Sequence, residues 1–278
     1  MPRIILSTLN ARYIHASMGL RYLYANMGQL QDSTEIVEFN INSRVIDIAE
    51  SLLDKQPAII GLGVYIWNAT QSLQLVNLIK TISPETIIIL GGPEVSYEYV
   101  QQEIVKNADY LISGSAEIAF KELCDDLLNK KIRLNKVIKA APIDISGIKL
   151  PYTNYSDEDI RNRVIYVEAS RGCPFKCEFC LSSLDKTVYP FDLDIFLNEM
   201  EILYQRGVRH FKFVDRTFNL KVTSNIRIME FFLNKIDNEN TEKLLLHFEL
   251  IPDHLPEKLK STISQFPNGS IQFEIGIQ

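Results

Sequence analysis

Residues 168–180 read EASRGCPFKCEFC and carry Cys173, Cys177 and Cys180 in the pattern C-x-x-x-C-x-x-C, directly after a predicted strand over 164–169. In a chain without a recognisable export signal, clustered cysteines indicate metal ligation rather than disulfides. Three thiolates cannot close a tetrahedral zinc site, and no histidine lies nearby. Soft thiolates suit an iron–sulfur cluster, and three ligands on a four-iron cluster leave one iron open to a substrate. Zinc and a plain electron-transfer cluster remain the alternatives.

Strands and helices alternate on the carboxyl side of this stretch. The apolar pattern predicts strands over 164–169, 208–214, 244–251 and 270–277, and helices over 193–205, 224–236 and 256–265. The last predicted strand ends the sequence with no helix to cover it, and sheet edges need protection. We therefore expect the sequence to be a fragment of a longer protein, with a natural edge strand as the alternative.

Near-continuous apolar strands alternate with amphipathic helices in the first 130 residues as well. Strands are predicted over 3–9, 35–40, 58–65, 86–90 and 110–113, and helices over 18–31, 44–55, 69–82 and 116–129. Such strands are buried on both faces, which is typical of a parallel sheet between two layers of helices. The pattern predicts an α/β domain with a flavodoxin-like, doubly wound parallel sheet.

The alternation is interrupted between residues 131 and 160, a stretch that contains Pro142, Gly147 and Pro151. Proline and glycine at such a break are typical of an interdomain linker. We therefore expect an N-terminal domain over 1–130, a linker over 131–160 and a second α/β domain over 161–278.

The composition is that of an ordinary globular protein. Hydrophobic residues make up 46% of the chain, charged residues make up 23%, and the formal net charge is −6. The apolar runs are far shorter than the roughly 20 residues of a membrane helix. The composition argues against a disordered chain, a membrane span and bulk nucleic-acid binding. Because no secretory signal opens the sequence, we expect a cytoplasmic protein.

The cysteine pattern resembles that of the radical S-adenosylmethionine (radical SAM) enzymes. In that family the cysteine loop follows the first strand of a partial (β/α) barrel and holds a [4Fe–4S] cluster, whose open iron binds SAM. An electron from a reduced donor such as flavodoxin or ferredoxin then cleaves SAM. The resemblance implies that residues 161–278 form the first four strands of a radical SAM barrel, with Cys173, Cys177 and Cys180 as cluster ligands.

Five further residues stand where this family contacts SAM. Phe179 matches an aromatic residue packed near the adenine; a loop aromatic that fills the core is the alternative. Asp215 ends the second barrel strand, where the family holds the SAM ammonium, often with a Gly-Gly-Glu motif that this chain lacks. A surface ion pair or a helix cap is the alternative for Asp215. Glu249 lies near the end of the third barrel strand, and Gly276 and Gln278 end the fourth. The Gly-x-Gln end of the fourth strand resembles the strand end that reaches the SAM ribose in this family; a plain core strand is the alternative.

A flavodoxin-like domain ahead of a radical SAM barrel resembles the cobalamin-binding class of these enzymes. The resemblance rests on the loops 9–20, 63–68, 91–94 and 113–117, which follow strands at the edge where open α/β sheets bind ligands. It implies cobalamin contacts from Asn10, His15, Gly19, Tyr65, Gly91, Gly92, Pro93, Ser113 and Gly114.

His15 does not fit the D-x-H-x-x-G motif in which a histidine binds cobalt. Tyr13 replaces the aspartate, and Gly19 comes one residue too late. We therefore expect cobalamin with an extended nucleotide tail and with His15 as a hydrogen-bonding residue rather than a cobalt ligand. A degenerate Rossmann-like domain that recruits a partner is the alternative. NAD is not expected, because no G-x-G-x-x-G pattern is present.

Cobalamin and SAM together imply radical methyl transfer to an unknown substrate, such as a small molecule. A cobalamin-dependent rearrangement or cyclisation is one alternative, and a non-catalytic sensor or scaffold is another. A tRNA methylthiotransferase would need three more cysteines in the N-terminal domain, which has only Cys124. We expect Cys124 to be a core residue.

Overall fold

The fold is given by a computed structural model, which describes residues 3–131, 133–141, 144–178, 180, 187–236 and 244–276. The chain divides into two compact units, Met1–Asn154 and Tyr155–Gln278, named unit 1 and unit 2 below. None of the helices in the described ranges is both long and apolar enough to cross a membrane.

Unit 1 is built on a six-stranded parallel sheet with the order β2-β1-β3-β4-β5-β6. Its strands are β1 (Ile4–Asn10), β2 (Thr34–Asn40), β3 (Ile59–Gly63), β4 (Ile87–Gly91), β5 (Tyr110–Ser113) and β6 (Val137–Lys139). The first five strands follow the flavodoxin order, so that prediction is confirmed. Every residue of β1 is buried, because this strand lies inside the sheet with helices on both of its faces.

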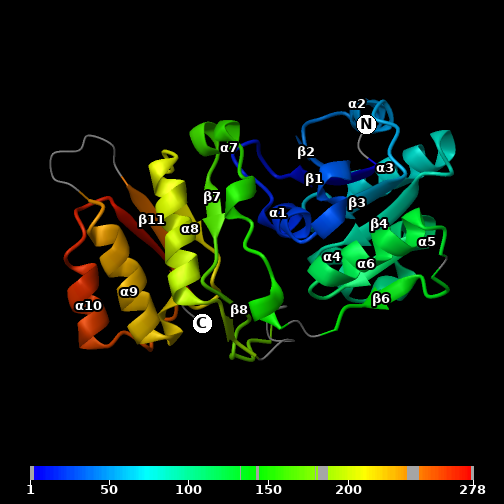
Figure 1. Ribbon diagram of the computed structural model, residues 1–278. Coiled ribbons are helices and arrows are strands. Elements are labelled where there is room, and N and C mark those ends of the chain that lie inside the picture. Colours follow the sequence, from blue (N-terminus) through cyan, green and yellow to red (C-terminus); the bar gives the residue numbers. More distant parts are fainter. Residues whose placement is uncertain are drawn as a thin grey trace. The chain divides into compact units, whose positions relative to one another are not determined.

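Two layers of helices cover this sheet (Figure 1). One layer contains α2 (Val45–Leu53), α3 (Ala69–Ile82) and α5 (Glu103–Asn107), and the other contains α1 (Met18–Ala25) and α6 (Glu117–Leu128). Alternate side chains of β1 enter the two cores: Ile5 packs with the first layer and Ile4 with the second. Cys124 on α6 is fully buried in the second core, as expected, and this burial raises the pKa of its thiol.

The structure differs from the sequence-based prediction at two places in unit 1. The helix predicted over 18–31 ends at Ala25, because Gly28 has a φ of +57° and begins a 3₁₀ turn that runs to Ser33. Part of the predicted linker, β6, instead pairs with β5 at the sheet edge. A three-residue strand between basic residues carries too little apolar pattern to be recognised. In addition, the sequence did not predict the short helices α4 (Pro93–Ser96) and α5, or the 3₁₀ turns Tyr99–Gln101, Ile145–Gly147 and Tyr152–Asn154.

Unit 2 contains a four-stranded parallel sheet with the order β12-β11-β10-β7. The strands are β7 (Ile165–Val167), β10 (His210–Phe213), β11 (Leu245–Leu250) and β12 (Ile271–Ile275). The helices are α7 (Asp157–Asn162), α8 (Leu193–Gln205), α9 (Val222–Leu233) and α10 (Glu257–Ile263), and a 3₁₀ turn spans Phe218–Leu220. A two-stranded antiparallel ribbon joins β8 (Ser170–Arg171) to β9 (Tyr189–Pro190). Strands and helices alternate as the sequence predicted for a partial (β/α) barrel.

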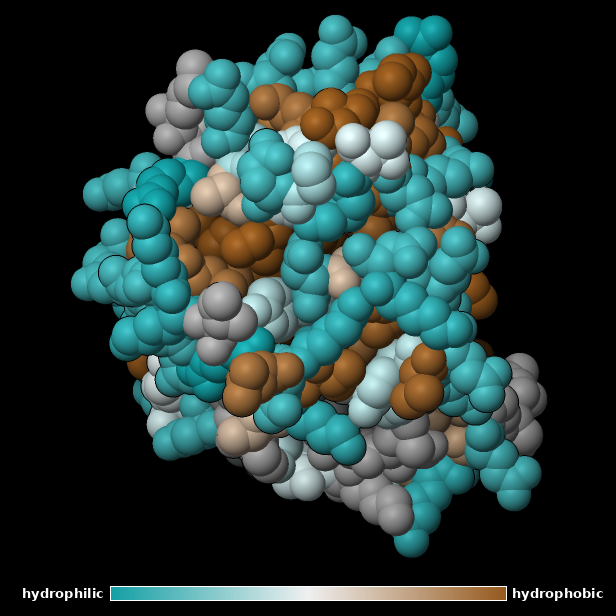
Figure 2. Space-filling model, turned by 90° about the vertical axis from the view of Figure 1, so that its right-hand side faces the viewer, coloured by the Kyte–Doolittle hydropathy of each residue, from teal (hydrophilic) through white to brown (hydrophobic). Residues whose placement is uncertain are grey.

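Phenylalanines form the core between this sheet and the helices α8, α9 and α10, which lie side by side in Figure 1. The ring of Phe213 on β10 lies 4.5 Å, between centroids, from that of Phe248 on β11, and Phe248 lies 4.2 Å from Phe218. Phe196 from α8 and Phe232 from α9 complete the cluster. On the face seen in Figure 2 the surface is mostly hydrophilic, and its apolar side chains lie in separate patches.

Candidate functional site

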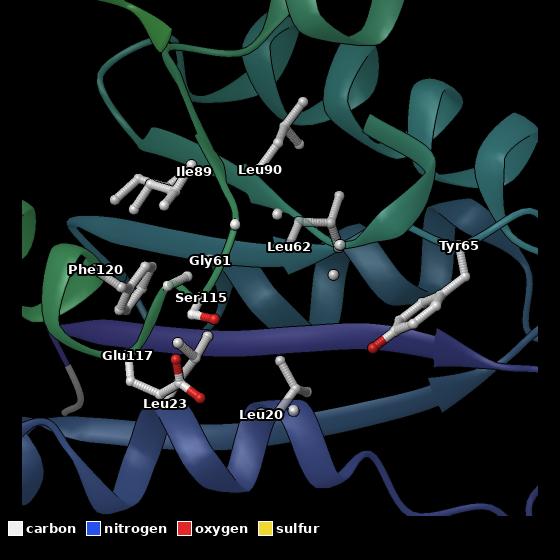
Figure 3. A pocket seen from close by; sticks show the side chains of 17 residues that line it. Leu20, Leu23, Gly61, Leu62, Tyr65, Ile89, Leu90, Ser115, Glu117 and Phe120 are labelled. Carbon is white, nitrogen blue, oxygen red and sulfur yellow. The ribbon is translucent and has the colours of Figure 1, made fainter. Parts of the chain in front are cut away.

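Unit 1 contains a pocket of about 200 Å³ between α1 and α6, above the carboxyl halves of β3 and β4 (Figure 3). Its lining is mainly apolar. The lining residues are Gly19, Leu20, Leu23, Gly61, Leu62, Gly63, Tyr65, Ile89, Leu90, Gly91, Gly92, Ile112, Gly114, Ser115, Ala116, Glu117 and Phe120. A mainly apolar pocket with few polar groups is typical of a site for a small molecule or cofactor.

Glycines inside β3 make room for the side chains that pack beside this pocket. A Cβ at Gly61 would lie 2.7 Å from the ring of Phe120, a pocket residue on α6. A Cβ at Gly63 would lie 3.3 Å from the hydroxyl of Thr8. Because glycine weakens a strand, two of them within one buried strand indicate close approach by a neighbour or a ligand.

Polar groups reach the pocket at its edges. Tyr65 directs its hydroxyl toward α1, and burial raises the pKa of this phenol while a hydrogen bond with Ser17 opposes the rise. The carboxylate of Glu117, the first residue of α6, lies near Ser115 and Leu23 in Figure 3. An apolar interior with a few polar groups at the edge suits a ligand with an apolar ring and a polar attachment.

The nine residues predicted to contact cobalamin separate into two groups. Those that line the pocket are Gly19, Tyr65, Gly91, Gly92 and Gly114, and those outside its lining are Asn10, His15, Pro93 and Ser113. Asn10 is buried, and its side-chain amide donates to Glu38 at 2.9 Å. Sequence reasoning missed most of the apolar wall from α1 and α6 and did not single out Gly61 of β3, whereas Gly63 opens the predicted loop 63–68. The Gly61-x-Gly63 pair inside an apolar strand was the available signal.

A buried ion pair holds the loop between β1 and α1. The guanidinium of Arg21 on α1 lies 2.8 Å from the carboxylate of Glu38 on β2, with both side chains at most 5% exposed. Glu38 also accepts from the backbone N–H of Ser17 at 2.6 Å, and Ser17 is the N-cap of α1. These contacts fix the start of α1, and with it Gly19 and Leu20 of the pocket wall.

The cysteine loop of unit 2 is closed at its base by the β8–β9 ribbon. Arg171 pairs with Glu168 at 2.6 Å, and the N–H of Phe191 donates to the carbonyl of Ala169 at 3.0 Å. Gly172 has a φ of +90°, and a Cβ there would collide with the carbonyl of Thr187, so only glycine fits. These contacts therefore hold the two ends of the loop together.

Asp215 supports this base from the end of β10. Its side chain is only 2% exposed and accepts from the Ser170 hydroxyl at 2.6 Å and from the N–H of Ala169 at 2.9 Å. Burial raises the pKa of Asp215 to about 7, although both hydrogen bonds oppose the rise. The structure thus gives Asp215 contacts within the protein, whereas its predicted contact with the SAM ammonium stays a prediction.

The three cysteines of the motif lie in this loop. Cys173 is buried, with its sulfur 3.9 Å from the hydroxyl of Thr217, whereas Cys177 and Cys180 are half-buried. Three thiols form a donor set that suits an iron–sulfur cluster. Among the described residues, however, no group of three histidine, cysteine or acidic side chains is already arranged to hold a metal ion.

Of the four other residues predicted to contact SAM, the structure describes two, Glu249 and Gly276. Phe179 and Gln278 lie outside the described residues. Glu249 is half-buried near the end of β11, and burial raises the pKa of its carboxyl while the charge of Arg216 opposes this. Gly276 follows β12 directly. Asp215, Glu249 and Gly276 thus stand at the carboxyl ends of neighbouring parallel strands.

Comparison with known proteins bears first on unit 1. Residues 5–124 match the family model of the B12 binding domain. This segment contains every residue that lines the pocket between α1 and α6.

Two relatives align with about two thirds of the chain. The uncharacterized methyltransferase PH0819 from Pyrococcus horikoshii is 28% identical over 200 residues, which are 63% of this chain and 43% of the relative. The cobalamin-dependent radical SAM methyltransferase TokK from Streptomyces tokunonensis is 22% identical over 211 residues, which are 63% of this chain and 29% of TokK. The matched region is thus less than half the length of either relative.

Two solved structures share the fold over nearly the whole chain. The radical SAM methyltransferase TsrM from Kitasatospora setae, solved with tryptophan and a SAM analogue, has a TM-score of 0.72 at 15% identity and matches 99% of this chain and 59% of TsrM. The cobalamin-dependent SAM radical enzyme OxsB, solved with aqua-cobalamin, has a TM-score of 0.73 at 17% identity and matches the full chain and 44% of OxsB. At these identities the likeness shows the fold alone.

Proposed function

We propose that the chain binds cobalamin in unit 1 and a [4Fe–4S] cluster with SAM in unit 2, and that it serves radical methyl transfer to a small-molecule substrate. The pocket between α1 and α6 carries this proposal, because it lies wholly within the segment that matches the B12 binding domain. When bound, the cluster would supply the electron that cleaves SAM, and cobalamin would carry the methyl group. A reduced flavodoxin or ferredoxin would be the electron donor.

The pocket would take the nucleotide tail of cobalamin. Its leucine, isoleucine and phenylalanine walls suit an aromatic base, and the absence of side chains at Gly61 and Gly63 lets that base approach the sheet. At the same end of the sheet, the loop after β3 exposes Ile66 and Trp67, and Trp67 stacks on Tyr65 with ring centroids 4.6 Å apart. This apolar rim suits one face of the macrocycle.

Substitution of one pocket glycine tests the cobalamin site. Gly61→Val would push on Phe120 and fill the pocket, so we expect this variant to lose bound cobalamin. Gly147→Val is the matched control, because a Cβ at Gly147 meets nothing within 4 Å. The measurement is the cobalamin absorbance that stays with each protein after gel filtration. Equal retention by the Gly61→Val variant and the parent would contradict the proposed site.

The role of His15 has its own test. His15 lies outside the pocket lining and in a loop that lacks the aspartate of the cobalt-binding motif. We expect His15→Ala to keep the bound cofactor and its visible spectrum. If the cobalt(II) electron paramagnetic resonance signal of the parent shows nitrogen hyperfine coupling that His15→Ala lacks, then His15 is a cobalt ligand.

The cluster is tested with the cysteines themselves. Anaerobic reconstitution should load iron and sulfide into the parent chain but not into a variant with Cys173, Cys177 and Cys180 all changed to Ala. Cys124→Ala is the matched control, because this thiol lies in the core of unit 1 and should not affect iron content. Cleavage of SAM by the reduced, loaded protein would then separate an enzyme from a cofactor-binding sensor.

A further inference from the structure

The sheet of unit 2 has two chemically different faces. Alternate residues of β10 and β11, such as Phe213 and Phe248, point into the phenylalanine core under α8, α9 and α10. The residues between them point to the opposite face. The side chains on that face are Tyr166, His210, Lys212, Leu245, His247, Glu249, Gln272 and Glu274. Seven of these eight side chains are polar; His247 is buried, and the other six are half-buried or exposed.

Three of these side chains meet at one oxygen atom. Lys212 and His247 are direct neighbours in the register of β10 and β11. The Lys212 Nζ atom lies 3.4 Å from Oε2 of Glu274, and the His247 Nε2 atom lies 3.0 Å from the same oxygen. The side chains of Lys212 and His247 are 25% and 10% exposed, whereas that of Glu274 is 59% exposed. Two largely buried nitrogen groups thus converge on an exposed carboxylate.

This arrangement is poorly explained as a structural ion pair. An exposed carboxylate contributes little to stability, because solvent screens it and its side chain loses freedom when it is held. The ammonium group of Lys212, in contrast, is largely shielded from solvent and is stabilised by a nearby acceptor. Glu249 lies beside Glu274 in the register of β11 and β12, and each carboxylate repels the other. Glu274 is therefore the member of the cluster that a ligand could displace at least cost.

We infer that Lys212 and His247 form a binding site for the carboxylate of a small-molecule ligand, and that Glu274 occupies this site when no ligand is bound. An incoming carboxylate would place an oxygen where Oε2 of Glu274 lies, and Glu274 would turn toward solvent. The inference rests on the proposed function in one respect: it names the ligand class for the unit in which SAM and the methyl acceptor would bind. The carboxylate could belong to either of these two molecules.

Titration of the full 278-residue chain with acetate tests this site without any cofactor. The chain has only four histidines, so the ring signal of His247 can be assigned in an NMR spectrum by its loss in His247→Gln. We expect acetate to shift this signal in a saturable way. Lys212→Met should weaken the apparent affinity about tenfold, because the main positive charge is lost. Glu274→Gln should strengthen it about threefold, because the competing charge is removed.

Matched controls come from the exposed pair Glu257 and Lys260 on α10, whose charged atoms lie 2.7 Å apart. Glu257→Gln and Lys260→Met should leave the response of His247 unchanged. Acetate affinity that does not increase in Glu274→Gln, or a shift confined to the other histidines, would overturn the inference. S-adenosylhomocysteine, added at a concentration at which equilibrium dialysis shows it bound to the chain, then distinguishes the source: loss of the acetate response assigns the carboxylate to SAM, and an unchanged response assigns it to the methyl acceptor.

Cofactor content separates this inference from the proposed function. If Lys212→Met and Glu274→Gln bind iron and cobalamin as the parent does but show no change in acetate affinity, only the carboxylate site fails. If the parent binds acetate at His247 but takes up neither cofactor, the proposed function fails and the carboxylate site stands.

Discussion

The carboxylate of Asp215 accepts a 2.6 Å hydrogen bond from the hydroxyl of Ser170, which stands 45 positions earlier in the chain. A second hydrogen bond comes from the N–H of Ala169 at 2.9 Å. Through these contacts the end of β10 fixes the first residues of the cysteine loop. Without them, these residues would have many conformations. Asp215 is thus a positioning residue for the loop that would carry the cluster.

Removal of this carboxylate should loosen the loop. Asp215→Ala leaves two buried donors without their acceptor, which typically costs about 1–3 kcal/mol for each such group. We expect faster amide hydrogen exchange at residues 168–173 and a smaller effect from Ser170→Ala, which removes only one donor. Asp253→Ala is the control, because Asp253 is exposed. Equal exchange rates in Asp215→Ala and the parent would show that the hydrogen bonds do not hold the loop.

The same carboxyl predicts a dependence of stability on pH. Its pKa is about 7 in the folded protein and near the ordinary 3.8 in the unfolded chain. Between these values the folded state holds a proton that the unfolded state has released, so this contribution to stability is lost as the pH rises toward 7. Asp215→Asn cannot titrate. The free energy of unfolding of the parent, relative to Asp215→Asn, should therefore fall between pH 5 and pH 8, as measured by hydrogen exchange of β10.

The sequence could predict most of the fold and the cysteine motif but not the contacts of Asp215. Alternation of apolar and polar residues is a local signal, which is why the longer strands of both units were found, whereas the two- and three-residue strands β6, β8 and β9 were not. The cysteines were found because their spacing is local too. The pairing of Asp215 with Ser170 depends on how β7 and β10 come together, and no local pattern carries that information.

Local sequence patterns also do not predict all of the pocket of unit 1. The loops after the strands lie at the carboxyl edge of the sheet, as expected, because parallel strands all end at that edge, but their contacts with cobalamin stay a prediction. The wall formed by Leu20, Leu23 and Phe120 comes from the packing of α1 and α6 over the sheet, which the sequence alone does not give. In the sequence these side chains have the apolar pattern of core residues, and in the structure they contribute both to the core and to the pocket lining.

Gly92 should be the most sensitive glycine of this edge. Its φ is +106°, and a Cβ there would collide with the backbone of Val64. We expect Gly92→Ala to destabilise unit 1 by about 2–3 kcal/mol. Gly114→Ala is the matched control: Gly114 also has a positive φ, of +94°, but its nearest contacts are an ordinary 3.6 Å or more, so about 1 kcal/mol is expected. Urea unfolding followed through Trp67, the single tryptophan, reports on unit 1. Equal losses in both variants would contradict this account.

The buried pair of Arg21 and Glu38 gives the last prediction. Each partner alone would be an uncompensated buried charge, so Arg21→Met should destabilise unit 1 by about 3–5 kcal/mol, again measured through the fluorescence of Trp67. The double variant Arg21→Met with Glu38→Gln removes both charges and should recover part of this loss. In Glu38→Gln a neutral amide oxygen replaces the carboxylate that accepts from the N–H of Ser17, which weakens this hydrogen bond at the start of α1, so the double variant should still bind cobalamin less tightly than the parent. The exposed pair Arg44 and Asp47, with charged atoms 2.6 Å apart, is the control, and Arg44→Met should leave the stability of unit 1 nearly unchanged because solvent screens this pair. A double variant no more stable than Arg21→Met would show that the cost comes from lost packing of the arginine rather than from the unpaired charge.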